Sequence, residues 1–329
     1  MTATYSAHAV IAKVSRYVER RTPCMLWGAP GIGKSDMVAQ VAEARGLQLV
    51  DIRLPLMESV DLRGLPAVID GVTRFMPPEE MQRATQRPSL IIWDEINSAP
   101  MSVQVASYQA ILNNRIGEFD FGPETRHVCA GNRLSDKAGA QMMSSALMNR
   151  MAHIDVEADA KAWIAWAAEN SISPLLMGFM NYRAELLHKP VTGAREFPSP
   201  RTWAMASRFL DLPKHERQDM VAGLVGGPAA IEFEAFAQLV GELDTPAVIC
   251  ADPDRARLPS AENIGGAYGV TAALAYFVDS KTAQAGAHYI KRLPMEFHAL
   301  FATLLTARDS KIASKAFASV AVASGARMV

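Results

Sequence analysis

Two patterns of apolar residues occur in the first half of the chain, and each predicts one kind of element. Between residues 6 and 21 the apolar positions recur every three or four residues, which is typical of an amphipathic helix. Short apolar runs at 23–27, 47–53 and 88–95 are typical of strands. The last run is continuously apolar before its end, which favours a central parallel strand buried on both faces. The pattern predicts an α/β fold, with a parallel sheet flanked by helices.

The pattern continues to about residue 157 and then changes. Up to that point we expect a loop at 58–64, a polar connector at 133–140, helices at 33–44, 102–113 and 141–149, and strands at 127–132 and 152–156. Beyond it, short helical segments alternate with Gly-Pro turns, and a tail at 311–326 is also predicted to be helical. An α/β part is therefore followed by an all-helical part.

Two segments of the α/β part have the patterns of short β structure. In Ala67–Phe75, two β-prone arms surround Asp70 and Gly71, a dipeptide that suits a type I′ hairpin turn. In Arg115–Phe121, polar and apolar residues alternate before a Gly-Pro turn, which is typical of a strand with a turn. An ordinary surface hairpin explains the first segment as well as a functional insert does.

The segment between the first predicted strand and the next helix fits the phosphate-binding pattern G-x-x-x-x-G-K-[ST]. Its glycines allow a tight turn in which several backbone N–H groups face one anion at a helix N-terminus. Lys34 supplies a positive charge for the β- and γ-phosphates, and the Ser35 hydroxyl can bind Mg²⁺. The predicted nucleotide-binding residues are Gly28, Ala29, Pro30, Gly31, Ile32, Gly33, Lys34 and Ser35.

Two adjacent carboxylates, Asp94 and Glu95, end the apolar run at 88–95. In an open parallel sheet, ligands bind at the carboxyl ends of the strands. There Asp94 can hold Mg²⁺, and Glu95 can polarise the attacking water, a role typically worth about 10²–10⁴ in rate. Taken alone, the pair would be interpreted as a helix cap or a turn. With a phosphate-binding loop upstream, we interpret it as catalytic.

Three further polar residues are candidates, and each has a structural alternative. Asn132 follows a predicted strand and could orient the lytic water, or could be a left-handed asparagine that starts a loop. Arg150 ends a predicted helix, where a cation commonly complements the helix dipole. Arg201 lies in a first helical turn, after a natural cap at Ser199 and Pro200. The dipole disfavours a cation there unless a bound phosphate compensates it, and an exposed arginine is the alternative.

Composition limits the class of protein. The 329 residues, 50% of them apolar, exceed the usual size of a single hydrophobic core. The net charge of −1 argues against a generic nucleic-acid or anionic-membrane binder. No apolar run approaches the roughly 18 residues that a membrane span needs, and the three scattered cysteines lack metal-binding spacing. We therefore expect a cytoplasmic protein without a membrane segment.

The order of these features resembles that of an AAA+ ATPase, and more narrowly of the MoxR-like branch, including its CbbQ/NorQ-like activators. The order runs through the phosphate-binding loop, a hairpin, a strand with Asp-Glu, a second β insert, a strand with Asn, a helix with Arg, and a helical segment with Pro-Arg. Asp94–Pro100 is similar to the usual sequence of the branch after the acidic pair. The resemblance covers roughly residues 1–210, and the C-terminal third has no counterpart in it.

The resemblance implies a role for each candidate residue. Asn132 would be sensor 1, Arg150 the arginine finger and Arg201 sensor 2. An arginine finger acts across a subunit boundary and is typically worth about 10³–10⁵ in rate, so the resemblance implies a homo-oligomeric ring, usually a hexamer. The sequence before Arg150 departs from the usual Pro-Leu-Pro-Glu-Ala-like run, so that Arg133 or Arg115 could be the finger instead.

The resemblance also implies a domain organisation. We expect an AAA+ core at 1–157 with β-hairpin inserts at about 54–80 and 115–122, and then an α-helical lid and a helical extension at 158–245 and 246–329. The implied function is an ATP-driven ring that remodels a partner protein, commonly one with a von Willebrand factor A domain. A DNA-associated motor or loader is the alternative, and a nucleotide-gated binding module that barely hydrolyses ATP is a third hypothesis.

Overall fold

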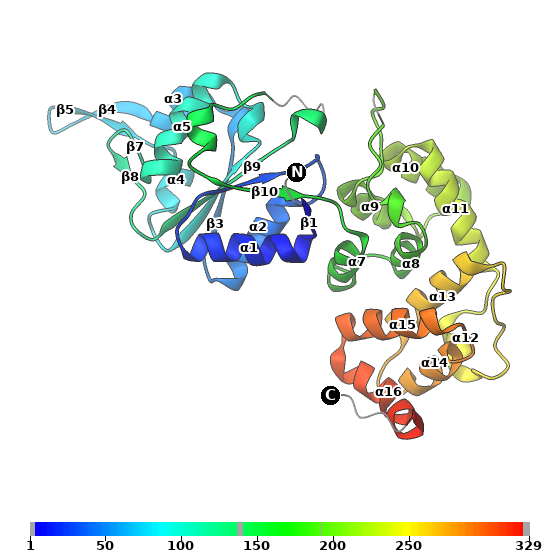
Figure 1. The fold of residues 1–329 in the computed structure, drawn as a ribbon. Coiled ribbons are helices and arrows are strands. Elements are labelled where there is room, and N and C mark those ends of the chain that lie inside the picture. Colours follow the sequence, from blue (N-terminus) through cyan, green and yellow to red (C-terminus); the bar gives the residue numbers. More distant parts are fainter. Residues whose placement is uncertain (1–3, 137–140, 192, 325–329) are drawn as a thin grey trace. The chain divides into compact units, whose positions relative to one another are not determined.

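The computed structural model consists of two compact units (Figure 1). The first unit spans residues 1–158 and the second 159–329. The residues that the structure describes are 4–136, 141–191 and 193–324. Two sequence predictions extend outside them, the connector at 137–140 and the tail helix at 325–326.

The first unit contains a six-stranded sheet in which all neighbouring strands are parallel. Its strand order is β1-β10-β2-β9-β6-β3. The strands are Thr4–Tyr5 (β1), Cys24–Trp27 (β2), Gln48–Arg53 (β3), Ser89–Asp94 (β6), Thr125–Gly131 (β9) and Ala152–Val156 (β10). This sheet confirms the predicted α/β fold. The sequence does not predict β1, because two residues are too few to show a period.

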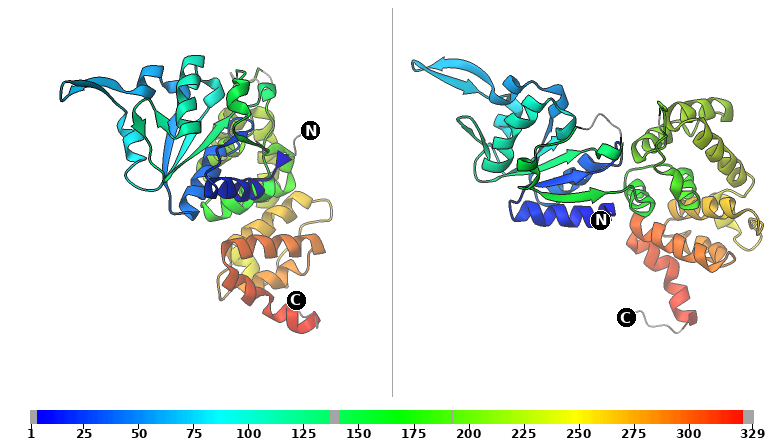
Figure 2. Two further views of the ribbon diagram at one scale, coloured as in Figure 1. Left: turned by 60° about the vertical axis from the view of Figure 1, so that its left-hand side comes forward. Right: turned by 45° about the horizontal axis from the view of Figure 1, so that its top comes forward.

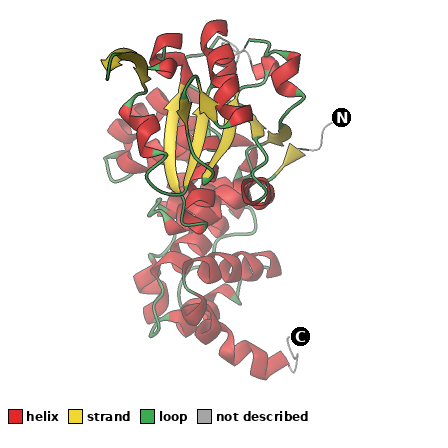
Figure 3. Ribbon diagram, turned by 90° about the vertical axis from the view of Figure 1, so that its left-hand side faces the viewer, coloured by secondary structure: helices red, strands yellow, loops and turns green. Residues whose placement is uncertain are grey.

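Helices cover both faces of this sheet (Figure 3). They are α1 (Ala7–Glu19), α2 (Lys34–Ala44), α3 (Ser59–Arg63), α4 (Glu79–Arg83), α5 (Met101–Asn113) and α6 (Ser145–Met148). Strand β6 separates two apolar cores, because Leu90 and Ile92 belong to the core with α1 and α2, whereas Ile91 and Trp93 belong to the core with α5. Every residue of β6 is buried, which confirms the prediction of a strand buried on both faces.

Both predicted β inserts are present as hairpins. The first consists of β4 (Leu65–Ile69) and β5 (Val72–Met76), and it projects from the rest of the first unit (Figures 1 and 2). At its turn, Asp70 and Gly71 have φ values of +53° and +76°, as a type I′ turn requires. The second is much smaller, because residues 115–121 form two two-residue strands, β7 (Arg115–Ile116) and β8 (Phe119–Asp120), around the turn.

Two predictions of local structure are wrong. Residues 58–64, predicted to be a loop, contain helix α3, whose start is capped because the Asp61 carboxylate accepts the N–H of Glu58 at 2.8 Å. The helix predicted at 141–149 is only the short α6. It begins late because the N–H of Gln141 donates to the carbonyl of Asn97 at 2.7 Å, which holds this residue outside the helix.

The second unit is helical in the residues that are described. Its helices are α7 (Ala160–Glu169), α8 (Pro174–Tyr182), α9 (Pro200–Ala206), α10 (Lys214–Val225), α11 (Gly227–Gly241), α12 (Pro246–Ala251), α13 (Ile264–Phe277), α14 (Ala283–Ile290), α15 (Met295–Arg308) and α16 (Ser310–Ser324). Helices α8 and α13 pack closely, since a Cβ on Gly178 would lie 3.0 Å from the Cα of Gly269. The predicted division of this unit at residue 245 stays a prediction.

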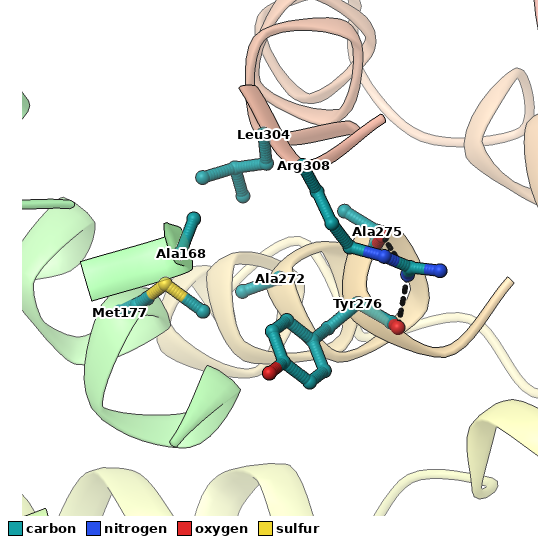
Figure 4. A pocket seen from close by; sticks show the side chains of 7 residues that line it. All are labelled: Ala168, Met177, Ala272, Ala275, Tyr276, Leu304 and Arg308. Carbon is teal, nitrogen blue, oxygen red and sulfur yellow. Dashed lines mark hydrogen bonds between the residues drawn. The ribbon is translucent and has the colours of Figure 1, made fainter. Parts of the chain in front are cut away.

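A small cavity lies among α7, α8, α13 and α15 (Figure 4). Its volume of about 10 Å³ leaves room for one water molecule at most. The Arg308 guanidinium beside it donates to the carbonyls of Ala275 and Val278, at 2.8 and 2.7 Å, and so binds the C-terminal end of α13. Across the described residues, no helix is both long and apolar enough to cross a membrane.

Candidate functional site

The loop between β2 and α2 has the backbone of an anion-binding turn. Its first residue, Gly28, donates its N–H to the carbonyl of Gly131 on β9 at 3.2 Å. A Cβ at position 28 would lie 2.9 Å from the carbonyl oxygen of Val156, so the close packing requires glycine. Gly31 and Gly33 have φ values of +78° and +88°, which also favour glycine. Helix α2 begins directly after Gly33, which has no side chain to cap it, so its first N–H groups can face an anion.

Lys34 lies inside this loop, and only 8% of it is exposed. Its Nζ donates to the carbonyls of Gly28 and Ala29, at 2.7 and 3.1 Å, and to the side-chain Oδ1 of Asn132 at 3.0 Å. The structure therefore brings together two predicted site residues that are separated by almost a hundred positions. The ammonium group is held at the phosphate-binding loop by oxygen atoms.

Ser35 and Asp94, the two predicted Mg²⁺ ligands, contact each other directly. The Ser35 Oγ donates to Oδ2 of Asp94 at 2.8 Å, and the other carboxylate oxygen accepts the N–H of Glu95 at 2.9 Å. Asp94 is 9% exposed, at the carboxyl end of β6. Mg²⁺ prefers oxygen ligands and commonly binds through one or two carboxylates and phosphates. The hydroxyl and the carboxylate at the loop fit this ion.

Glu95 follows Asp94 in a strained conformation. Its φ and ψ are +54° and +33°, in the left-handed region that a residue other than glycine rarely adopts. Strain of this kind costs of order 1–3 kcal/mol and is concentrated at functional sites. The residue is exposed, whereas Asp94 before it and Ile96 after it are buried. The turn therefore places one buried and one exposed carboxylate side by side at the end of β6.

Asn132 follows β9 and is 6% exposed. Its backbone is bound by the side chain of Asn97, which lies in the turn after Glu95. Its own side chain accepts from Lys34. A loop-start asparagine in the left-handed conformation would have a positive φ, and Asn132 is absent from the positive-φ residues of the described chain.

Residues 23–151 match the family model of the AAA domain (dynein-related subfamily). This part of the chain is an AAA domain. The match runs from β2 to the turn before β10 and includes the loop, Asp94, Glu95 and Asn132. The family implies nucleotide binding. The predicted assignment to the MoxR-like branch stays a prediction.

Two solved structures show how far the overall likeness extends. A RuvB variant from Thermotoga maritima is 14% identical, with a TM-score of 0.41, over 75% of this chain and 82% of that chain. A candidate ATPase from Cytophaga hutchinsonii is 13% identical, with a TM-score of 0.38, over 93% of this chain and 83% of that chain.

The three arginines considered as a finger have different surroundings in the AAA domain. Arg133 donates to Asp155 Oδ1 at 3.1 Å and to the carbonyl of Val156 at 2.8 Å, so it is bound within its own chain. Arg115 donates to the carbonyl of Gly117 at 2.7 Å, within its own hairpin. Arg150 is exposed in the turn after α6, and none of the ion pairs between described residues involves it. Its role as the finger stays a prediction.

Arg201 belongs to the second unit. It lies in the first turn of α9, where the predicted cap is present: the Ser199 Oγ accepts the N–H of Thr202 at 3.1 Å, and Pro200 is the first helical residue. The side chain of Arg201 is exposed. Its role as sensor 2 stays a prediction.

Two polar residues close to the predicted site residues are not identified from the sequence. Asn97 binds the backbone of Asn132, a contact between residues 35 positions apart that no local pattern signals. Asp51 lies on β3, next to β6, and burial together with the charge of Asp94 raises the pKa of its carboxyl group, although Arg53 lowers it in part. Its position near the end of a strand beside β6 was the available signal.

Proposed function

We propose that the AAA domain binds ATP with Mg²⁺ and hydrolyses the ATP to ADP and phosphate. The observation that carries the proposal is the hydrogen bond between Ser35 and Asp94, which is 2.8 Å long. It lies at the end of the loop that also holds Lys34. Side chains from α2, β6 and the end of β9 thus meet where a helix N-terminus attracts an anion.

Each residue has a part in the proposed reaction. The N–H groups of the loop and the Lys34 ammonium bind the β- and γ-phosphates, whose oxygens replace the acceptors that Lys34 now uses. Ser35 and Asp94 hold Mg²⁺, which when bound neutralises charge that develops on the phosphates. Glu95 polarises the attacking water and takes its proton. Asn132 orients that water, since its amide lies beside Lys34.

We further propose that the chain acts as a ring, usually hexameric, that remodels a partner protein with a von Willebrand factor A domain. The surroundings of Arg150 support the ring, because this arginine is exposed and could reach a neighbouring subunit. The hairpin β4–β5 supports a protein partner, because its apolar side chains face solvent: Val68 is 76% exposed, Leu65 70% and Val72 58%. Apolar surface of this kind marks interaction sites.

ATP turnover by the wild type and by Glu95→Gln tests the hydrolysis. We expect the substitution to lower kcat by about 10²–10⁴, the usual value of general-base catalysis. The matched control is Glu43→Gln, an exposed glutamate near the end of α2, which should leave kcat unchanged. Equal turnover in the wild type and Glu95→Gln would support a nucleotide-gated binding module instead.

The ring is tested by measuring the mass of the assembly with and without ATP. We expect Arg150→Ala to keep nucleotide binding and to lower turnover by about 10³ or more, as loss of an arginine finger does. Arg133→Ala is the matched control, and its main effect should be on stability, because Arg133 pairs with Asp155. A monomer at micromolar concentration with ATP would contradict the ring. Turnover stimulated by DNA, with a steep salt dependence, would contradict a protein partner.

A further inference from the structure

The side chain of Asn97 is completely buried in the three-residue turn that follows Glu95, Ile96–Ser98. Its amide makes two hydrogen bonds with the backbone of one residue. The N–H of Asn132 donates to Oδ1 of Asn97 at 3.1 Å, and Nδ2 of Asn97 donates to the carbonyl of Asn132 at 2.7 Å. The Asn97 side chain therefore binds both the N–H and the carbonyl of Asn132, as the backbone of a neighbouring strand would.

The position of Asn132 in the sheet explains this contact. The pairing of β9 with β6 ends at Cys129 and Trp93, and the pairing of β9 with β2 ends at Gly131 and Trp27. Asn132 comes after the last pair, so no strand of the sheet binds its backbone. The Asn97 side chain takes that place. A buried backbone group without such a partner would cost free energy comparable to that of a lost hydrogen bond.

The contact is also sterically tight. A Cβ on Gly131 would lie 2.3 Å from the Oδ1 of Asn97, so the residue before Asn132 must be glycine for the amide to reach the backbone. The carbonyl of Asn97 in turn accepts the N–H of Gln141 at 2.7 Å. Asn97 is thus fixed from both sides and has little freedom to follow a displaced Asn132.

The contact connects the two residues that are proposed to act on the attacking water, Glu95 and Asn132. Asn97 lies two residues after Glu95, and the N–H of Ser98 donates to the carbonyl of Glu95 at 2.8 Å, which closes the turn. On the other side, the Asn132 side chain accepts from Lys34 at 3.0 Å. Any shift of the turn would therefore change the positions of both the Glu95 carboxylate and the Asn132 amide.

We propose that Asn97 is a positioning residue for ATP hydrolysis, which holds the Asn132 amide in a fixed relation to Glu95 and to the phosphate-binding loop. This inference rests on the proposed hydrolysis of ATP at the same site. Asn97 acts through Asn132, so it should contribute to the rate of the chemical step and not to nucleotide affinity. Misplacement of a reacting group by about 1 Å can cost about 100-fold in rate.

A double-mutant cycle with Asn97→Ala and Asn132→Ala tests this role. We expect Asn97→Ala to lower kcat by about 10- to 100-fold, whereas the Kd of a fluorescent ATP analogue changes by less than about threefold. Once Asn132→Ala has removed the amide, Asn97→Ala should lower kcat no further, because groups that act as a unit are non-additive. Losses that simply multiply in the double variant would overturn the inference.

Two further variants keep the test decisive. Asn97→Asp has the same shape and keeps the acceptor for the Asn132 N–H, but sets a carboxylate oxygen against the Asn132 carbonyl, so kcat should fall here too even if Asn97→Ala does not fold. Gln104→Leu is the matched control, because Gln104 is another fully buried amide of the same unit and donates to the carbonyl of Ala99 at 3.0 Å. It should reduce thermal stability and leave the kcat of the folded protein within about twofold.

The outcomes separate this inference from the proposed function. If the wild type hydrolyses ATP and both Asn97 variants do so at the wild-type rate, the positioning role is wrong and the hydrolysis stands. If the wild type does not hydrolyse ATP, the proposed function fails and the inference fails with it.

Discussion

The two units bury polar side chains for different purposes. In the first unit, Lys34, Asp94 and Asn132 are all less than 10% exposed, and they converge on one loop. In the second unit, Glu234 and Ser199 are equally buried, but Glu234 binds Arg217 of the neighbouring helix and Ser199 caps the start of α9. Burial alone therefore does not distinguish a site from a structural contact. What distinguishes them is the kind of partner.

In the second unit, the buried Glu234 carboxylate is fully paired with another side chain of the same unit. Arg217 donates through Nε and Nη2 to both carboxylate oxygens of Glu234, at 2.7 Å each, and this pairing raises the pKa of Arg217. A bidentate pair of this kind satisfies both ions and joins α10 to α11. In the first unit, Lys34 is held by carbonyl and amide oxygens. A phosphate can replace such acceptors, which is what a binding site requires.

The largest effect should come from Asp94→Asn. We expect turnover to fall by about 100-fold or more, because metal-ion catalysis supplies several kcal/mol of charge stabilisation and the amide is a weaker ligand. The free energy of unfolding should change by about 1 kcal/mol or less, since the amide oxygen can still accept the N–H of Glu95 while the amide NH2 donates to the Ser35 hydroxyl oxygen. Turnover across a Mg²⁺ titration, together with urea unfolding, measures both. A variant that is unstable but fully active would place Asp94 among the structural contacts.

Glu234→Ala should show the reverse behaviour. Removing one partner of a buried ion pair leaves the other charge uncompensated and typically costs about 3–5 kcal/mol. We expect the second unit to unfold at a lower temperature in calorimetry, while the kcat of the folded protein stays within about twofold. An unchanged unfolding temperature would show that the Arg217–Glu234 pair does not support this unit.

His127 is a buried polar residue of the first unit that lies outside the site. Trp93 donates to its Nδ1 at 3.1 Å, and its Nε2 therefore carries the proton and donates to the Asn114 side chain at 2.8 Å. Burial lowers the pKa of His127 to about 3. We therefore expect this residue to behave like the contacts of the second unit, with an effect on stability alone.

The pH dependence of unfolding tests this expectation. The unfolded chain protonates His127 near its ordinary pKa of 6.5, whereas the folded chain stays neutral down to about pH 3. Its stability contribution is thus complete above pH 6.5 and is lost as the pH falls toward 3, by at most about 1.4 kcal/mol per pH unit. His127→Gln should flatten this slope. His153→Gln removes an exposed Trp–His pair and serves as the control. Identical slopes in all three proteins would contradict the assignment.

The sequence predicts those parts of the fold that local patterns determine. The phosphate-binding loop, strand β6 and the Asp70-Gly71 turn each depend on a few adjacent residues, and all three are as predicted. Helix α3 is missed because its cap is a Glu–Asp pair and not the usual Ser or Thr. The start of α6 is wrong because a distant carbonyl binds Gln141.

In the site, too, local sequence patterns predict some residues, whereas others depend on contacts between distant parts of the chain. Lys34, Ser35 and Asp94 are predicted because their types and spacing are set by phosphate and metal chemistry. Asn97 is not predicted, because its contact with Asn132 depends on where β9 stops pairing with β6, and this follows only from the register of the sheet. The packing of the second unit also depends on contacts between distant helices, such as the approach of Gly178 to Gly269.

The most direct test of nucleotide binding at the loop is the affinity of Lys34→Ala for ATP with Mg²⁺, measured by calorimetric titration beside the wild type. We expect that the wild type binds, that the variant loses at least about 100-fold in affinity, equal to about 2.7 kcal/mol, and that ATP-dependent assembly is lost with it. Circular dichroism should show that both proteins remain folded. A folded Lys34→Ala protein that binds and hydrolyses ATP as the wild type does would contradict ATP binding and hydrolysis at this loop.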